Sequence, residues 1–232
     1  MKNIVIIGCG NGIGLRTAQI LSQENKIIGI SRTQNPELNH PNINFHQIDI
    51  ISGNLDNITF PEIVDGLVYT PGSINLKAFH KLSTDDFRND FEINVLGSVR
   101  VIQKLLPNLK KSQSASIVLF SSVAVGLGMP FHTSVAVSKS AVEGLTRSLA
   151  AEFSTSKIRV NAIAPSLTDT NLASQLLSSP EKREASAKRH PLQRIGAPGD
   201  IAELTAFLIS EKSSWITGQV FAVDGGISSL KL

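Results

Sequence analysis

Asn3-Ile4-Val5-Ile6-Ile7-Gly8-Cys9-Gly10-Asn11-Gly12-Ile13-Gly14-Leu15 is the stretch on which the fold of this chain depends. Four apolar residues, mostly β-branched, are typical of a strand buried on both faces of a parallel sheet. Glycines at alternate positions follow, and then apolar residues at helical spacing from Leu15 to Leu21. A buried strand, a glycine loop and an amphipathic helix predict a dinucleotide-binding unit, in which a pyrophosphate approaches the backbone at the helix N-terminus.

The composition is that of an ordinary globular protein, and at this length we expect one α/β domain over residues 1–232. The net charge of +3 is too small to indicate a nucleic-acid partner. Cys9 is the single cysteine, so no internal disulfide can form, and a reducing cytoplasm is expected. We interpret Cys9 as a small residue that fills the loop rather than as a nucleophile. No apolar run has the length of a membrane span, the N-terminus has no signal-peptide core, and no metal site is indicated.

The second predicted strand, Lys26 to Arg32, ends where a dinucleotide fold meets the adenosine ribose. An acidic residue at this point would bind the ribose 2′-hydroxyl and repel a 2′-phosphate. This chain instead has Ser31 followed by Arg32, and a guanidinium can pair with a phosphate in bidentate fashion. The pattern favours NADP(H) over NAD(H), and the alternative is a solvated arginine in a loop.

Further strands are predicted at 43–48, 65–69, 116–120 and 158–164. The connector at 35–42 is rich in turn residues and too short for a full crossover helix. Helical patterns cover 85–106, where Phe87, Phe91, Val95 and Val99 recur at one-turn intervals, and 133–153. A further helix opens near Pro198, and the segment 215–226 closes the sheet.

Two features of these helices deserve a chemical interpretation. Asn94 is a poor helix former in the middle of the first one, which indicates a specific hydrogen-bonding purpose. Val135 and Lys139 are four residues apart on the second and therefore share a face. Glu143 and Arg147 have the same spacing, and we interpret them as an exposed ion pair.

Five landmarks follow one another in an order that resembles the short-chain dehydrogenase/reductase family. They are Gly8-x-x-x-Gly12-x-Gly14, Asn94 in its helix, the segment from Pro165 to Thr170, Arg194 to Ala202, and Trp215 to Gly226. The resemblance spans nearly the whole chain. It implies an α/β, single-domain Rossmann fold, a doubly wound parallel sheet with helices on both faces. It also implies a small-molecule substrate and a homodimer or homotetramer, with the small residues Ser138, Ser140, Ala141 and Gly144 available for helix packing between subunits.

The resemblance also implies the site. Asn94, Ser122 and Lys139 match the family's catalytic positions, but Val135 stands where the family has its catalytic tyrosine. The family's Asn-Asn-Ala-Gly is replaced by Tyr69-Thr70-Pro71-Gly72, and Ser166 replaces the glycine of Pro-Gly-x-x-x-Thr. The implied cofactor-binding residues are Gly8, Asn11, Gly12, Ile13, Gly14, Ser31, Arg32, Asp49, Ile50, Thr70, Pro71, Gly72, Lys139, Pro165, Leu167 and Thr170.

Valine has no proton to give, so another group must supply the proton of a carbonyl reduction. Tyr69, the single tyrosine, is expected to lie nearer the cofactor than the substrate. His132 lies one turn before Val135 and has a suitable intrinsic pKa, although a surface histidine is the commoner outcome. Lys139 acting through water is a third route, since burial could lower its pKa.

Two functions remain open. The first is an NADP(H)-dependent oxidoreductase that acts on a small carbonyl or alcohol with an atypical proton donor. The second is a pseudoenzyme that binds the cofactor without turnover, as a sensor or a subunit partner. Residues 168–192 are expected to form a substrate loop or lid. Their basic tail (Lys182, Arg183, Lys188, Arg189 and His190) is interpreted as a solvated helix face, or alternatively as a lid that attracts an acidic substrate.

Overall fold

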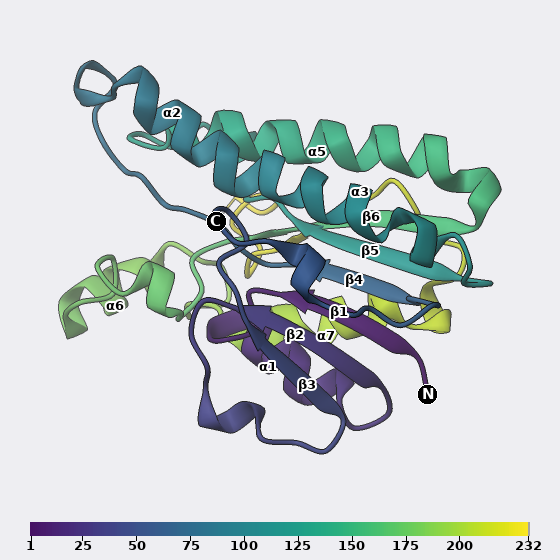
Figure 1. Cartoon of the computed structure of the whole chain (residues 1–232). Helices are drawn as coiled ribbons and strands as arrows, with labels where there is room; N and C mark the ends of the chain where they lie inside the picture. The colour runs from purple at the N-terminus through teal and green to yellow at the C-terminus, as the bar shows by residue number, and fades with distance from the viewer. Residues whose placement is uncertain (232) are drawn as a thin grey trace.

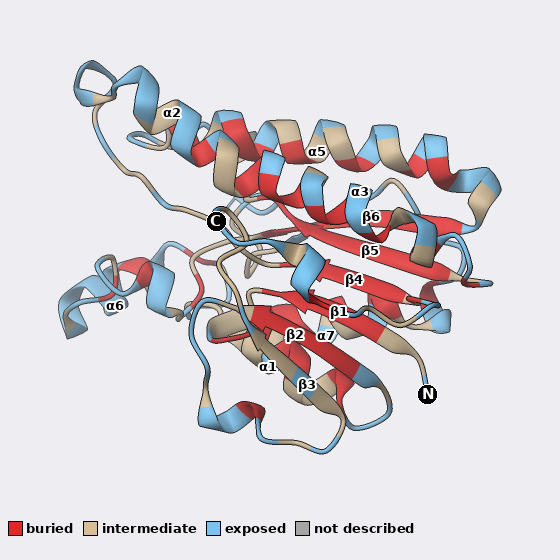
Figure 2. Ribbon diagram, viewed as in Figure 1, coloured by how far each residue is buried: buried red, intermediate tan, exposed pale blue. Residues whose placement is uncertain are grey.

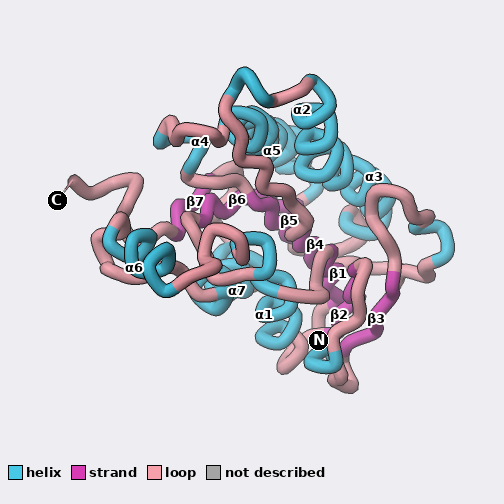
Figure 3. Tube along the Cα trace, turned by 90° about the vertical axis from the view of Figure 1, so that its left-hand side faces the viewer, coloured by secondary structure: helices cyan, strands magenta, loops and turns pink. Residues whose placement is uncertain are grey.

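A parallel sheet of seven strands forms the centre of the molecule in the computed structural model, which describes residues 1–231. The strand order is β3-β2-β1-β4-β5-β6-β7, and every neighbouring pair is parallel. Seen along the sheet, the strands cross the molecule as one twisted layer between two groups of helices (Figure 3). The strands are β1 (Asn3–Ile7), β2 (Lys26–Ser31), β3 (Ile43–Gln47), β4 (Gly66–Tyr69), β5 (Ala115–Phe120), β6 (Ile158–Pro165) and β7 (Val220–Val223).

Helices cover both faces of this sheet (Figure 1). On one face lie α1 (Gly12–Leu21) and α7 (Pro198–Ile209), which pack against each other. On the other lie α2 (Thr84–Phe91), α3 (Gly97–Leu109) and α5 (Thr133–Phe153), while the short α4 (Ala124–Leu127) precedes α5 and α6 (Pro180–Lys188) projects from one end. Among the described helices, none is both long enough and apolar enough to cross a bilayer.

The core consists of two apolar layers, one on each face of the sheet. Between the sheet and α3 and α5, it contains Leu105 and Val142, and between the sheet and α1 and α7, it contains Ala18 and Leu208. The central strands are buried along their whole length, the helices that pack on the sheet expose their outer faces, and α6 is exposed over most of its length (Figure 2). Continuous burial on both faces explains why these strands read as unbroken apolar runs in the sequence.

The chain changes direction next to β1, which pairs with β2 on one side and β4 on the other. Such a switch point leaves a crevice at the carboxyl ends of β1 and β4, where open α/β sheets bind their ligands. The connection between β2 and β3 contains only a 3₁₀ turn, Pro36–Leu38, as the shortness of the connector predicts. Five further 3₁₀ turns occur at 55–57, 79–81, 154–156, 171–173 and 211–213.

The helix expected at 85–106 is not regular. A π-helical segment, Glu92–Leu96, separates α2 from α3, and Asn94 lies within it. The expected apolar stripe is also wrong at Phe91, which is exposed, whereas Asp90 and Asn94 are 2% exposed and face α5. A π turn shifts the face that a helix presents by inserting one residue, and such turns occur frequently at functional sites. Asp90 and Asn94 face α5 because α5 supplies hydroxyl partners for both side chains.

Candidate functional site

The glycine loop between β1 and α1 is held in the shape that the sequence predicts. Gly8 and Gly12 have φ angles of +85° and +54°, a region that residues with a Cβ rarely adopt. A Cβ on Gly14 would lie 2.3 Å from the carbonyl oxygen of Gly8, so the loop and the first turn of α1 touch backbone to backbone. Asn11 precedes α1 without capping it through its side chain. The first N–H groups of α1 are therefore free to bind an anion.

The end of β2 lies directly against this loop. A Cβ on Gly10 would lie 2.6 Å from Ser31 Oγ and 2.5 Å from the carbonyl oxygen of Thr33. The neighbouring Arg32 is exposed, and no hydrogen bond engages its guanidinium among the described residues. Asp49 follows β3 and accepts a hydrogen bond from the N–H of Ile51 through its side chain. The arrangement leaves a cation and a hydroxyl beside the glycine loop.

A cavity of about 500 Å³ opens at the carboxyl ends of the strands. A volume of this size is within the range of small-molecule sites. Much of its wall is apolar and comes from the segment after β4, from the segment between β5 and α5, and from residues 167–189. The structure thus brings one glycine loop, three strand ends and the beginning of α5 around one space.

The residues that the family resemblance assigns to catalysis and to cofactor binding divide into three groups by their relation to this cavity. Eight line it: Ile13, Thr70, Gly72, Ser122, Lys139, Pro165, Leu167 and Thr170. Asn94 lies behind the wall, buried next to Gly72. The others do not line it and lie at the ends of β1 to β4 and the start of α1: Gly8, Asn11, Gly12, Gly14, Ser31, Arg32, Asp49, Ile50 and Pro71.

Lys139 is buried, at 7% exposure, and its ammonium donates a hydrogen bond of 2.8 Å to the carbonyl oxygen of Phe120. Burial lowers the pKa of Lys139 to about 8, and the negative charge of Asp90 opposes this shift. An amine with a pKa near neutrality can exchange protons at physiological pH, which a solvated lysine does poorly. Lys139 is therefore chemically suited to proton transfer.

The amide nitrogen of Asn94 makes all the side-chain hydrogen bonds that fix this residue. Its Nδ2 donates to Ser73 Oγ, to Ser138 Oγ and to the carbonyl oxygen of Asp90. Its Oδ1 is buried and has no partner among the described residues. A Cβ at Gly72 would lie 3.2 Å from Asn94 Oδ1 and 3.4 Å from Lys139 Nζ, so both atoms face the same point. A buried acceptor without a partner is costly, and it is satisfied when a hydroxyl or a water binds at this point.

Val135 lines the cavity at 5% exposure, at the position that would carry a phenol in the family pattern. Ser122 lines the same wall, and its Oγ accepts a hydrogen bond from the N–H of Ala124, so its own proton is available to a ligand. His132 also lines the cavity and is partly buried, and its Nδ1 lies 2.7 Å from the carbonyl oxygen of Pro130. His132 and Lys139 thus both have access to the cavity.

Tyr69 does not line the cavity, although its neighbour Thr70 does, in agreement with the interpretation that it is not the proton donor. It is 2% exposed, and its hydroxyl donates to the carbonyl oxygen of Ile93. Burial raises the pKa of Tyr69 well above its usual value. Cys9 is likewise buried, and burial raises its pKa to about 12, which suits a packing residue rather than a nucleophile.

Two side chains expected in solvent are corrected by the structure. His190 was expected on a solvated basic face, yet it is 2% exposed: its Nδ1 lies 2.8 Å from the carbonyl oxygen of Ser186 and its Nε2 2.8 Å from Ser166 Oγ. Glu143 does pair with Arg147, but its side chain is only 16% exposed because it also accepts from Ser121 Oγ. In both cases a partner distant in sequence covers the side chain.

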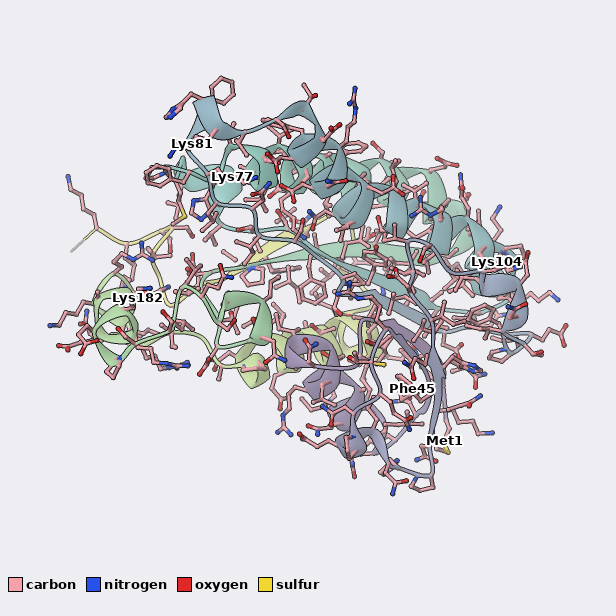
Figure 4. The ribbon with its side chains drawn as sticks, turned by 60° about the vertical axis from the view of Figure 1, so that its left-hand side comes forward. Met1, Phe45, Lys77, Lys81, Lys104 and Lys182 are labelled. Carbon is pink, nitrogen blue, oxygen red and sulfur yellow. The ribbon has the colours of Figure 1, made fainter. Side chains whose placement is uncertain are left out.

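The rest of the basic tail lies on α6 and after it, in the exposed positions predicted for it. Two of its members, Lys182 and Arg189, also line the cavity. Figure 4 shows Lys182 on α6, with Lys77 and Lys81 on the segment before α2 across from it. The cavity lies between these segments, since Ile74 and Leu76 line it from the other side.

Comparison with known proteins adds an independent observation. Residues 59–228 match the model of the family described as enoyl-(acyl carrier protein) reductase. The chain is 31% identical to the 3-oxoacyl-[acyl-carrier-protein] reductase FabG of Thermotoga maritima, over 97% of both proteins. It is also 36% identical to the inactive 2-(S)-hydroxypropyl-CoM dehydrogenase 2 of Xanthobacter autotrophicus, over 71% of this chain and 74% of that protein. The solved structure of ElxO with NADP bound superposes with a TM-score of 0.86 at 28% identity, covering 99% of each chain.

Proposed function

The chain belongs to the short-chain dehydrogenase/reductase family, and we propose that it is an NADP(H)-dependent oxidoreductase that acts on a small carbonyl or alcohol without a tyrosine proton donor. The observation that carries the proposal is the pairing of Lys139 Nζ and Asn94 Oδ1 around Gly72, at the wall of a cavity that Ser122 also lines. A hydroxyl, an amide oxygen and a lysine with a lowered pKa are the groups that polarise an oxygen and move its proton.

The residues present fit a dinucleotide. The backbone contact between Gly8 and Gly14 leaves no room for a side chain, and the free N–H groups of α1 suit a pyrophosphate. Arg32 and Ser31 supply a cation and a hydroxyl for the 2′-phosphate, which favours NADP(H), and a relative of known structure, ElxO, binds NADP. Asp49 and Ile50 would border the adenine, and Pro165, Leu167 and Thr170 the nicotinamide. When bound, this cofactor supplies the hydride.

The protein's own residues then handle the substrate oxygen. Ser122 donates its free hydroxyl proton in a hydrogen bond that polarises the carbonyl. The proton comes from Lys139, directly or through water bound at Asn94 Oδ1, or from His132. Of these, Lys139 is the better donor because it is buried beside Asn94 Oδ1 and its pKa is about 8, whereas His132 is only partly buried and its Nδ1 is engaged with the carbonyl oxygen of Pro130. The loss of a general acid costs about two to four powers of ten in rate, which leaves measurable hydride transfer.

We propose a lid function for residues 168–192, because α6 and the segments around it form one wall of the cavity. We also propose a homodimer or homotetramer built through α5, on whose outer face Gly144 has no neighbour within 4 Å of a Cβ position. A cytoplasmic location is proposed from the single cysteine, a buried thiol.

The second candidate is a cofactor-binding pseudoenzyme. It is favoured by Val135 itself and by the likeness to a dehydrogenase that is described as inactive. The two candidates are distinguished by NADPH oxidation with a broad panel of ketones and aldehydes. The enzyme proposal predicts turnover by the wild type and its loss in Lys139→Met. NADPH binding without turnover on any substrate, or turnover unchanged in Lys139→Met, contradicts it.

A further inference from the structure

A buried carboxylate, Asp90, lies one helical turn before Asn94 and outside every motif of the family pattern. It is 2% exposed. Its Oδ1 accepts a hydrogen bond of 2.5 Å from Ser73 Oγ, and its Oδ2 accepts one of 2.5 Å from Ser134 Oγ. Ser73 lines the cavity, whereas Asp90 does not. A carboxylate is rarely buried unless its lone pairs are satisfied, so this cluster needs an explanation.

The cluster determines which way the Asn94 amide points. Ser73 gives its hydroxyl proton to Asp90, so the Ser73 oxygen is left as an acceptor. It accepts from Asn94 Nδ2 at 3.1 Å, as does Ser138 Oγ, while the Asp90 carbonyl oxygen accepts at 2.8 Å. With three acceptors on the nitrogen side, the opposite amide orientation would set the Asn94 oxygen against acceptors. Asn94 Oδ1 must therefore face Gly72 and Lys139.

The same cluster surrounds the position of the missing phenol. Ser134 precedes Val135 in α5, and Ser138 donates to the carbonyl oxygen of Val135 one turn later. The polar network thus links α2 and the π-helical segment to the turn of α5 that presents Val135 and Lys139 to the cavity. Asp90 is its only carboxylate among the described residues, and it is the charge that counters the effect of burial on Lys139.

Other titratable groups near α5 have partners of their own. Glu143 pairs with Arg147, Glu92 with Arg100, Asp86 with Lys77 and Asp85 with Arg88. His132, Tyr69 and Arg159, on the start of α5, on β4 and on β6, donate to backbone carbonyl oxygens. Glu152 lies exposed at the far end of α5, and the exposed cations Lys182 and Arg189 line the cavity opposite Lys139.

We propose that Asp90 is a positioning residue: through Ser73 it fixes the Asn94 amide, and as a buried anion it keeps Lys139 in the ammonium form that supplies the substrate proton. The last clause rests on the proposed function, but the first two do not. When the carbonyl carbon accepts a hydride from the nicotinamide, the carbonyl oxygen takes one proton from Lys139. The lysine is left as a neutral amine and is protonated again from solvent in the cavity.

The test follows Lys139 by NMR in the ligand-free protein. Its side-chain nitrogen is assigned by comparison with Lys139→Met and titrated with pH. Asp90→Asn removes the anion, so the ammonium of Lys139 is less stable than in the wild type, where the pKa of Lys139 is about 8. The midpoint of the Lys139 titration should therefore fall by roughly one pH unit. Asp85→Asn, on the exposed side of the same helix, leaves the midpoint unchanged. Asp90→Ser removes the same charge with a smaller side chain if Asp90→Asn does not fold.

Ser73→Ala separates orientation from charge. It keeps the carboxylate, so the Lys139 midpoint stays near its wild-type value, while the side-chain amide signals of Asn94 shift because one of its acceptors is lost. A Lys139 midpoint that does not fall without Asp90 overturns the proposal, as does an Asn94 amide unaffected by Ser73→Ala.

The pH profile of NADPH oxidation tests the part of the proposal that depends on the proposed function. In a protein that turns over, Asp90→Asn moves the alkaline limb of the profile to lower pH by the same amount as the NMR midpoint. If the midpoint moves in a protein that oxidises no NADPH, the positioning of Lys139 by Asp90 stands and the proposed function fails.

Discussion

Arg32→Ala is the substitution that most directly tests how the cofactor is chosen. Arg32 follows β2 and is exposed, and Ser31 lies against the glycine loop near Gly10. The adenosine 2′-phosphate of NADPH is expected beside both side chains. NADH lacks this phosphate, so it should not respond to the loss of the guanidinium.

The magnitude follows from the exposure of the site. A hydrogen bond to a charged group contributes about 1.5–3 kcal/mol. Because Arg32 is exposed and salt screens its charge, we expect the low end, a loss of about tenfold in NADPH affinity. Ser31→Ala removes a neutral partner and should cost about threefold, from roughly 0.5–1 kcal/mol.

The assay is the dissociation constant of NADPH and of NADH, measured by nicotinamide fluorescence at two salt concentrations. Arg16→Ala is the matched control, because Arg16 is an exposed arginine whose Nε lies 3.9 Å from a Cβ position on Gly199, towards α7. An equal loss for both cofactors in Arg32→Ala would refute the argument. Tighter binding of NADH than NADPH by the wild type would refute it as well.

Three further outcomes are expected. Tyr69→Phe leaves the carbonyl oxygen of Ile93 without its buried donor, so it should lower the free energy of unfolding in urea by about 1–2 kcal/mol and leave NADPH oxidation unchanged. A loss of turnover at normal stability would instead identify Tyr69 as a proton donor. Gly14→Ala places a Cβ 2.3 Å from the Gly8 carbonyl oxygen, so the folded protein should lose most of its NADPH affinity, and normal binding would contradict the close contact in the loop. Hydrogen bonds from Arg194 and from a backbone N–H hold the pKa of Asp200 below its usual range, so Asp200 stabilises the fold above the unfolded-state pKa and loses this effect as pH falls through the folded-state pKa. Asp200→Asn should therefore lower the melting temperature at pH 7, and the difference from wild type should narrow below about pH 4. A difference in melting temperature that stays constant across pH would contradict this.

The parts of the fold that the sequence predicts are those with a local signal. β1 and β5 contain contiguous apolar runs, β6 is rich in β-branched and apolar residues, and α5 begins and ends where the periodicity of 133–153 indicates. The glycine loop is recognisable because Gly8 and Gly12 need backbone angles that other residues avoid. These features depend on neighbours in the chain, and the structure confirms them.

The parts that the sequence does not predict depend on partners that are distant along the chain. Phe91 is exposed where the apolar spacing predicts burial, and its neighbour Asp90 is buried instead, because the helix continues into a π turn and α5 supplies Ser134 as a partner. His190 is buried because Ser166, 24 residues earlier, meets its ring. The spacing of Asp90 and Asn94, two polar residues one turn apart in a predicted helix, is the signal by which this cluster could have been found.

Hydride transfer without the tyrosine is the central claim, and a comparison of wild type with Val135→Tyr tests it most directly. Both proteins are first shown to bind NADPH, and NADPH oxidation is then measured with the same carbonyl panel. The account predicts turnover by the wild type, and a gain of about two to four powers of ten in the variant if the phenol reaches the substrate oxygen. Turnover by the variant alone would contradict the account, because the pocket would then be intact and the natural protein a cofactor-binding pseudoenzyme.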